Sequence, residues 1–379
     1  MKEYTKLCIS NERLISLLFM VILMPLIGVE VIAQNQKMKI ITRPDTLTGM
    51  KGNEGHFIIT PAFSYAPETG LEYGISGLFT MKEQKQPKYL SFVNPYVSYT
   101  IRNQFTSEIR VNYYTQKYFS QNVLSFIYYP LYYYGIGNNT KAGDYEFYTS
   151  KQVYMQGRVM YAVEDDVYLG VRYKIQNNHL VHFTDTTKFY EDHLFGLSGG
   201  WNIGVGPILF YDTRDNAQYP SKGVALEMSW VDYFAVYHYS NFHFFLRNYF
   251  NVNNEKNVLA WALSFNMING SAPFYEYNRL GGSNALRGYR DTRFIDRIMW
   301  FYEAEFRRSL FWKVKGVFFA GFGNVHPQLH DLTLYRTKVA LGVGLRYKIF
   351  KDQKLHVGLD YAVGLDNGNG FYIRLGEAF

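Results

Sequence analysis

The chain has 379 residues, a formal net charge of +7 and an aromatic content of 18%. Its one cysteine, Cys8, excludes a disulfide framework and thiolate metal sites. The basic residues do not gather into one patch or a known RNA-binding module, so the charge does not indicate a nucleic-acid partner.

Residues 1–33 have the pattern of a secretory signal. Basic residues precede the apolar run 14–27, and small side chains suit cleavage before Gln34. The alternative is an N-terminal anchor, but a membrane-spanning helix needs about 20 apolar residues and this run is shorter. We therefore predict an exported chain with a short periplasmic segment, 34–54, followed by one domain, 55–379.

Apolar and polar side chains alternate with a period of two along the rest of the chain. In 339–349, for example, the odd positions are Val, Leu, Val, Leu, Tyr and Ile, and the even positions include Arg346 and Lys348. This alternation is typical of half-buried strands. The predicted strands are 55–65, 70–82, 88–102, 104–118, 121–134, 149–163, 165–178, 192–212, 223–235, 237–251, 255–269, 297–309, 312–322, 335–349, 353–365 and 370–379.

An exported all-β chain with aromatic outer faces and no helical period favours a transmembrane barrel. Closure leaves no unpaired sheet edge in hydrocarbon, where each unsatisfied amide costs several kcal/mol. A soluble sandwich would need two apolar inner faces, and a propeller would need blade repeats, but no fixed repeat is present. We predict a 16-stranded antiparallel barrel in a bacterial outer membrane. An even strand count places both termini in the periplasm and the long connections 135–148, 179–191, 270–296 and 323–334 outside.

A Gly- and Arg-rich stretch, GGSNALRGYRDTRF, occupies residues 281–294 in the sixth outer loop. Within it, Leu286, Arg287, Gly288 and Tyr289 match the (L/V)RG(F/Y) motif of the BamA/TamA and two-partner-secretion transporter superfamily, also called bacterial surface antigen barrels. The chain resembles this family over roughly 55–379. The resemblance implies a sixteen-stranded barrel whose sixth loop folds back into the lumen.

Three further stretches carry the same resemblance. YDTRDNAQYPSKG at 211–223 resembles the family's D-x-R-D-N…P-x-x-G segment at a periplasmic turn, and YYYGIGNNT at 132–140 is similar to its third loop. The turn motif consists of Asp212, Arg214, Asp215, Pro220 and Gly223. The last strand resembles the signal by which barrel proteins are recognised for membrane insertion, although Glu377 departs from its apolar pattern. The apolar residues predicted to share one face there are Phe371, Ile373, Leu375 and Phe379.

An arginine inside a barrel needs partners, because an isolated buried charge is costly. A guanidinium with five fixed donors can hold a loop against carboxylates. Strand parity points three acids toward the lumen as candidate partners of Arg287. They are Glu303, Glu305 and Asp360. In the family the partner often lies in a D-x-G motif on strand 13, where this chain has Gly321, so we favour Glu305, which forms an E-x-R pattern with Arg307. The alternative is that Arg287 lies exposed in a flexible loop.

The seam between the first and last strands is predicted to pair weakly. Pro61 cannot donate to a ladder, and Gly370 and Gly376 weaken the last strand. In the family this seam can open sideways into the membrane. The alternative is an ordinary closed barrel that tolerates a proline near a strand end.

No pattern indicates an enzyme, a cofactor or a metal site. GLSGG at 196–200 fits the G-x-S-x-G pattern around Ser198, but the nucleophile elbow needs a following helix and none is predicted. His179 and His182 lie in a polar loop without further ligands. We therefore predict neither catalysis nor a bound cofactor.

The resemblance implies assistance in the insertion or translocation of proteins or lipids at the outer membrane. Family members with that activity usually carry POTRA domains, and 34–54 is shorter than the roughly 50 residues that a domain takes. We therefore expect a POTRA-less member that acts with partner subunits. The expected partners are outer-membrane lipids, periplasmic or surface lipoproteins and unfolded outer-membrane protein clients. The alternative is a structural or pore-forming barrel subunit without insertase activity.

Overall fold

The fold is known from a computed structural model. It describes residues 56–66, 69–80, 89, 91–183, 187–217, 219–252, 256–311, 313–348, 356–375 and 377–379. The predicted signal peptide 1–33, the segment 34–54 and Gly376 lie outside the described residues.

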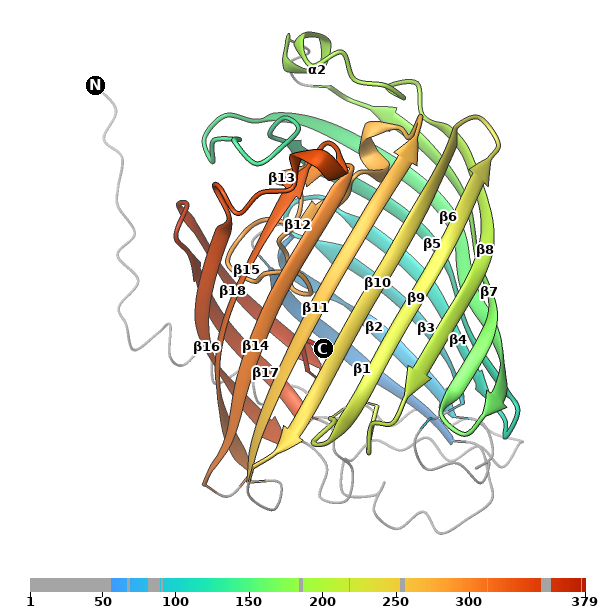
Figure 1. The fold of residues 1–379 in the computed structure, drawn as a ribbon, viewed down its shortest axis with the longest axis vertical. Coiled ribbons are helices and arrows are strands. Elements are labelled where there is room, and N and C mark those ends of the chain that lie inside the picture. The colour runs from blue at the N-terminus through green and yellow to red at the C-terminus, as the bar shows by residue number, and fades with distance from the viewer. Residues whose placement is uncertain are drawn as a thin grey trace.

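Sixteen strands of the described residues close into one antiparallel barrel, which confirms the predicted fold class (Figure 1). Around the barrel the order is β1-β18-β17-β16-β15-β14-β11-β10-β9-β8-β7-β6-β5-β4-β3-β2. The strands are β1 (His56–Ala66), β2 (Gly70–Thr80), β3 (Phe92–Thr100), β4 (Phe105–Tyr114), β5 (Tyr118–Tyr133), β6 (Glu146–Glu164), β7 (Val167–Val181), β8 (Gly200–Asp212), β9 (Gly223–Phe234), β10 (His238–Asn251), β11 (Asn257–Gly270), β14 (Ile298–Phe311), β15 (Val314–His326), β16 (Lys338–Lys348), β17 (His356–Gly364) and β18 (Gly368–Leu375).

The strand pattern separates an apolar outer face from a polar inner face. In β16, Val343 and Leu345 are 57% and 51% exposed, whereas Ala340 and Arg346 are buried. Because successive side chains of a strand point to opposite faces, closure turns one set outward and the other inward. An apolar outer face is what contact with lipid requires.

The connections differ in length at the two ends of the barrel. We call the end with the connections 134–145, 182–199, 271–297 and 327–337 the loop end, and the opposite end the turn end. At the turn end, β4 and β5 are joined by 115–117, and not by 119–120 as predicted. The side-chain oxygen of Thr115 accepts the N–H of Tyr118 at 2.8 Å, and this local turn lets β5 begin earlier.

The predicted strand 192–212 is wrong in its first residues, because β8 begins only at Gly200. The preceding residues follow a short helix, α2 (Thr187–Glu191), and include Gly196 and Gly199 with φ of +93° and +67°. These left-handed values interrupt a strand, so the alternation seen in 192–199 does not reflect pairing.

The loop between β11 and β14 also contains structure that the sequence did not predict. It holds a 3-10 turn, η3 (Phe274–Glu276), and two short strands, β12 (Asn278–Leu280) and β13 (Phe294–Asp296), which pair with each other. The 281–293 motif is therefore the tip of a hairpin. No helix in the described ranges is long and apolar enough to cross a membrane.

Candidate functional site

The motif residues at the hairpin tip adopt a backbone that glycine makes possible. Gly288 has φ of +112°, and a Cβ there would lie 3.0 Å from the backbone nitrogen of Gly364. The N–H of Gly288 donates to the hydroxyl of Tyr372 at 3.0 Å. Leu286 has φ of +63° and is fully buried, and Gly288 holds the chain after Arg287 against β17 and β18.

Arg287 is fully buried and contacts all three acids that strand parity points to. Its Nη1 lies 2.8 Å from Asp360, and its Nη2 lies 2.5 Å from Glu303 and also pairs with Glu305. The guanidinium carbon lies 3.5 Å from the ring centre of Phe319, a cation–π contact that sequence reasoning missed. Burial alone would lower the pKa of Arg287, but the three carboxylates outweigh it and raise the pKa above its ordinary value. The side chain therefore stays cationic.

Gly321 explains how this chain departs from the family pattern. It pairs directly with Glu303 across the β14–β15 ladder. A Cβ at Gly321 would lie 3.1 Å from both Cα and Cβ of Glu303. Two of the three acids that contact Arg287 are thus supplied by β14, and the small residue on β15 leaves room for Glu303.

The ion pairs extend from Arg287 to the end of the chain. Glu305 also accepts from Arg307 at 2.9 Å. Four further pairs link Arg346 to Asp360, Arg374 to Asp360, Arg346 to Glu377 and Arg307 to Glu377, the last three at 3.2, 2.9 and 3.7 Å. We call these eight residues the ion network: Arg287, Glu303, Glu305, Arg307, Arg346, Asp360, Arg374 and Glu377. Four guanidinium groups balance four carboxylates, so the buried cluster is formally neutral. Strand parity also points Arg346 and Arg374 inward, and that signal could have found them.

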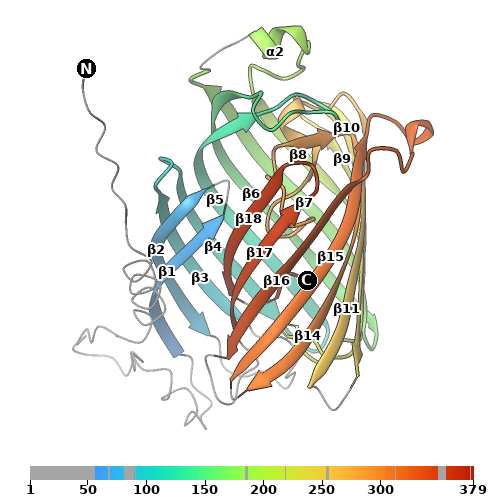
Figure 2. The same ribbon diagram turned by 90° about the vertical axis from the view of Figure 1, so that its left-hand side faces the viewer.

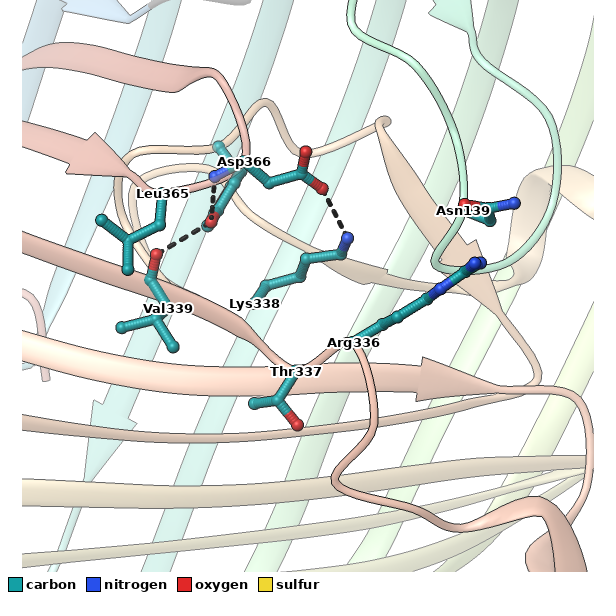
Figure 3. Close-up of a pocket in the computed structure, with 8 residues that line it drawn as sticks. Asn139, Arg336, Thr337, Lys338, Val339, Leu365 and Asp366 are labelled. Atoms are coloured by element: carbon teal, nitrogen blue, oxygen red, sulfur yellow. Dashed lines mark hydrogen bonds and ion pairs between the residues drawn. The ribbon is translucent and has the colours of Figure 1, made fainter.

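Tyr289 anchors the other side of the motif. Its hydroxyl donates to the carbonyl of Val339 at 2.8 Å and accepts the N–H of Asp366 at 3.3 Å. It also lines a pocket of about 410 Å³ at the loop end, whose rim includes Arg336 and the ion pair of Lys338 with Asp366 at 2.5 Å (Figure 3).

The turn motif 211–223 forms a second compact cluster. Asp212 is fully buried and accepts from Arg214 at 2.9 and 2.8 Å and from the hydroxyl of Tyr89 at 2.6 Å. The carboxylate of Asp215 accepts from Ser221. Pro220 accepts from Arg307 at 3.5 Å, and Gly223 has φ of +105°. The turn therefore touches the ion network through Arg307.

The C-terminal residues depart from the prediction. Phe371 and Ile373 lie on the outer face, because Tyr372 between them faces Asp360. The strand ends at Leu375, and Phe379 is buried among inner residues, with its backbone oxygen accepting from Nη2 of Arg307 at 3.3 Å. The prediction that Phe379 shares one face with Phe371 and Ile373 is therefore wrong, because the chain leaves the ladder after β18 and Phe379 packs against Arg307 on the inner side.

The seam residues lie where β1 meets β18 (Figure 2). Pro61 sits in the middle of β1, opposite Ile75 of β2, and Gly370 pairs with Ala362 of β17. Among the described residues, Tyr65 with Ile373 is the one registered pair between β1 and β18, whereas all eleven residues of β1 pair with β2.

Ser198 and the two histidines lie where β7 and β8 meet the loop between them. Ser198 lies in a turn that leads into strand β8. His179 lies within β7, which ends at Val181, and not in a loop as predicted, whereas His182 follows the strand. The described ranges contain no group of three or more His, Cys, Asp or Glu residues placed to hold a metal.

A closed barrel with an apolar, lipid-compatible outer face is the architecture of outer-membrane β-barrel proteins. In this barrel, carboxylates of the wall also neutralise an arginine of the loop between β11 and β14. The chain belongs to the Omp85 superfamily, whose domain matches residues 69–379. This membership confirms the resemblance drawn from the motifs.

Two solved structures are similar to the chain. BamA from Haemophilus ducreyi lacking POTRA domains 1-3 has a TM-score of 0.58 at 14% identity, over 86% of this chain and 70% of that one. CdiB from Escherichia coli has a TM-score of 0.57 at 10% identity, over 83% of this chain and 62% of CdiB, less than two thirds of its length. At these identities the likeness establishes the fold. No curated protein matches the sequence.

Proposed function

We propose that this barrel assists the insertion or translocation of proteins or lipids at the outer membrane, together with partner proteins and without bond chemistry of its own. The expected partners are lipoproteins, unfolded barrel clients and the surrounding lipids. In the proposed orientation both termini are periplasmic and the loop end faces the cell exterior. Membership in the Omp85 superfamily and the fold shared with BamA and CdiB support the proposal.

The observation that carries the proposal is the difference between the seam and its neighbours. In the described part of the chain one registered pair joins β1 to β18, and Tyr65 and Phe371 add a ring contact at 5.9 Å. An open strand edge is a template for pairing with another strand. A client strand could therefore add to β1 or β18 at lower cost than at any fully paired ladder.

Separate sets of polar contacts stabilise the strands on the two sides of the seam. On the β1 side, Glu72 of β2 accepts from Ser64, Tyr96 and Ser98. On the β18 side, the ion network ties β14, β16, β17 and β18 to the loop motif. Within the described residues none of these polar contacts crosses the seam, so it can part without breaking either set.

We infer that the motif loop folds into the barrel interior and holds the β18 wall in place when the seam parts. The inner-face positions of Glu303, Glu305 and Asp360 and the full burial of Arg287 support this inference. A fixed wall beside a movable β1 edge would give an incoming strand a defined template.

The test is a disulfide across the seam, in a Cys8→Ser background. The pair Tyr65→Cys with Ile373→Cys joins β1 to β18, and the control pair Phe63→Cys with Tyr73→Cys joins β1 to β2. Vesicles containing the oxidised protein are given an unfolded eight-stranded barrel protein, and its folding is followed by gel mobility.

The seam disulfide should abolish the acceleration of client folding, reduction should restore it, and the control disulfide should leave it unchanged. Full activity with a locked seam would refute the seam mechanism. No acceleration in any state, combined with ion conductance through the reduced protein, would favour the structural or pore-forming barrel.

A further inference from the structure

The loop between β15 and β16, residues 327–337, exposes apolar side chains that a loop in water would not carry together. Leu334 and Tyr335 are 75% and 70% exposed, and Leu329 and Leu332 are also exposed. Figure 2 shows this loop projecting sideways, past the outline of the strands, at the loop end. A contiguous exposed apolar patch on a soluble surface marks an interaction site.

A buried side chain, Asn324, holds the loop backbone in the conformation that exposes these apolar side chains. Asn324 has no exposed surface, and its amide nitrogen donates to the carbonyls of Thr333 and Tyr335 at 3.3 and 3.1 Å. Its amide oxygen accepts from Asn138 at 2.7 Å. The hydroxyl of Thr337 donates to the carbonyl of Leu334 at 2.7 Å. With its backbone held at these points, the loop presents its apolar side chains outward.

The loop leaves the wall at the level of an aromatic band on the outer face. Trp300, Tyr302 and Phe322 lie together there, with ring centres 6.0 Å apart for Trp300–Phe322 and 5.6 Å for Tyr302–Phe322. The indole N–H of Trp300 donates to His326, the last residue of β15, at 3.3 Å. Aromatic bands on barrels lie at the membrane–water interface. The exposed apolar side chains of the loop therefore continue the lipid-facing surface at that level.

The exposed cation of the loop suits the same position, and the acid of the loop, Asp331, lies 3.4 Å from the imidazole of His330. Arg336 follows Tyr335, lies 5.2 Å from its ring centre and is exposed. A cation beside leucines and a tyrosine is the composition of segments that lie in a lipid interface, where the apolar side chains enter the acyl boundary and the cation meets phosphate.

We propose that the β15–β16 loop is a membrane-contact element that lies in the headgroup region of the adjacent leaflet and inserts Leu334 and Tyr335 at the acyl boundary. This proposal requires only that the barrel lies in a membrane and does not depend on insertase activity. The membrane-contact proposal and the proposed insertion function can therefore fail separately. A lipid surface is the favoured occupant because the patch is continuous with the lipid-facing wall.

The experiment places an environment-sensitive nitrobenzoxadiazole label on Leu334→Cys in a Cys8→Ser background. The matched control is Tyr190→Cys on α2, which is 67% exposed but stands away from the barrel wall (Figure 1). Both proteins are placed in vesicles of phosphatidylethanolamine and phosphatidylglycerol, with and without a nitroxide-bearing lipid. Because both side chains are exposed, neither substitution should unfold the barrel. Retained compact gel mobility checks that both labelled proteins are folded.

The label at 334 should shift to the blue, be quenched by the nitroxide lipid and be shielded from iodide in the water. The label at 190 should show the opposite on all three measures. Equal, water-like behaviour of the two labels would overturn the proposal. A label at 334 that remains accessible to iodide in vesicles but is shielded from it in native outer membranes would also overturn the proposal. That result would indicate a protein partner.

Discussion

Replacing Arg287 by methionine tests the ion network most directly. Four carboxylates would then face three guanidinium groups, and the side chains of Glu305 and Asp360 have no exposed surface. Removing one partner of a buried ion pair costs about 3–5 kcal/mol, because the remaining charge stays away from water without compensation. Methionine retains apolar contact with Phe319, so the loss should reflect charge more than volume.

The measurement is the temperature at which the compact gel mobility of the barrel is lost, together with protease cleavage within 281–293. Arg287→Met should lower that temperature and open the motif to protease. Adding Glu303→Gln restores neutrality and should recover part of the loss, whereas Arg287→Lys keeps the charge without the fork and should be intermediate. An Arg287→Met protein as heat-resistant and uncleaved as the parent would refute the network's role. A double variant no better than the single one would show that charge is not the cause.

Two further predictions concern the turn and the hairpin. Asp212→Asn removes the charge that Arg214 and Tyr89 contact, so the free energy that stabilises the 213–222 turn should fall by about 1–3 kcal/mol. The turn should become sensitive to protease, and unchanged cleavage would contradict this. Burial raises the pKa of Asp296 from 3.8 to about 6, so its stabilising contribution is complete below pH 3.8 and is lost as the pH rises through about 6. At about 1.36 kcal/mol per pKa unit the loss is about 3 kcal/mol, and Asp296→Asn should make hairpin proteolysis independent of pH across this range. Equal protease resistance of the unsubstituted hairpin at pH 4 and pH 8 would count against it.

The strand order could be predicted because lipid on the outside enforces a strict alternation. All sixteen barrel strands correspond to predicted segments, with shifts at their ends where local turn chemistry decides. Thr115 and Gly199 show the limit, since a hydroxyl that closes a turn and a left-handed glycine leave little trace in a hydropathy pattern.

Secondary structure in the loops depends on contacts that sequence reasoning does not supply. The helix α2 is short, but Phe189 within it is buried against Tyr133, with ring centres 4.8 Å apart. The β12–β13 hairpin similarly depends on the packing of Leu280 and Phe294 in one buried cluster. Local propensity does not reveal such tertiary stabilisation.

The candidate site shows the same division. Parity places Glu303, Glu305 and Asp360 on one face because the period of a strand is two. It does not reveal that Arg287 contacts all three, since that depends on how the hairpin tip approaches β14 and β17. The inward turn of Phe379 was also unpredictable, because the alternation gives no sign that the ladder stops at Leu375.

The sharing of Glu305 between Arg287 and Arg307 has a consequence for biogenesis. Arg307 also donates to the backbone oxygen of Phe379, and Arg346 pairs with Glu377, so the cluster joins the loop motif to the residues that follow β18. Docking of the motif and placement of residues 377–379 should therefore depend on each other while the barrel folds. Deleting residues 377–379 would leave the arginines of β14 and β16 short of acceptors.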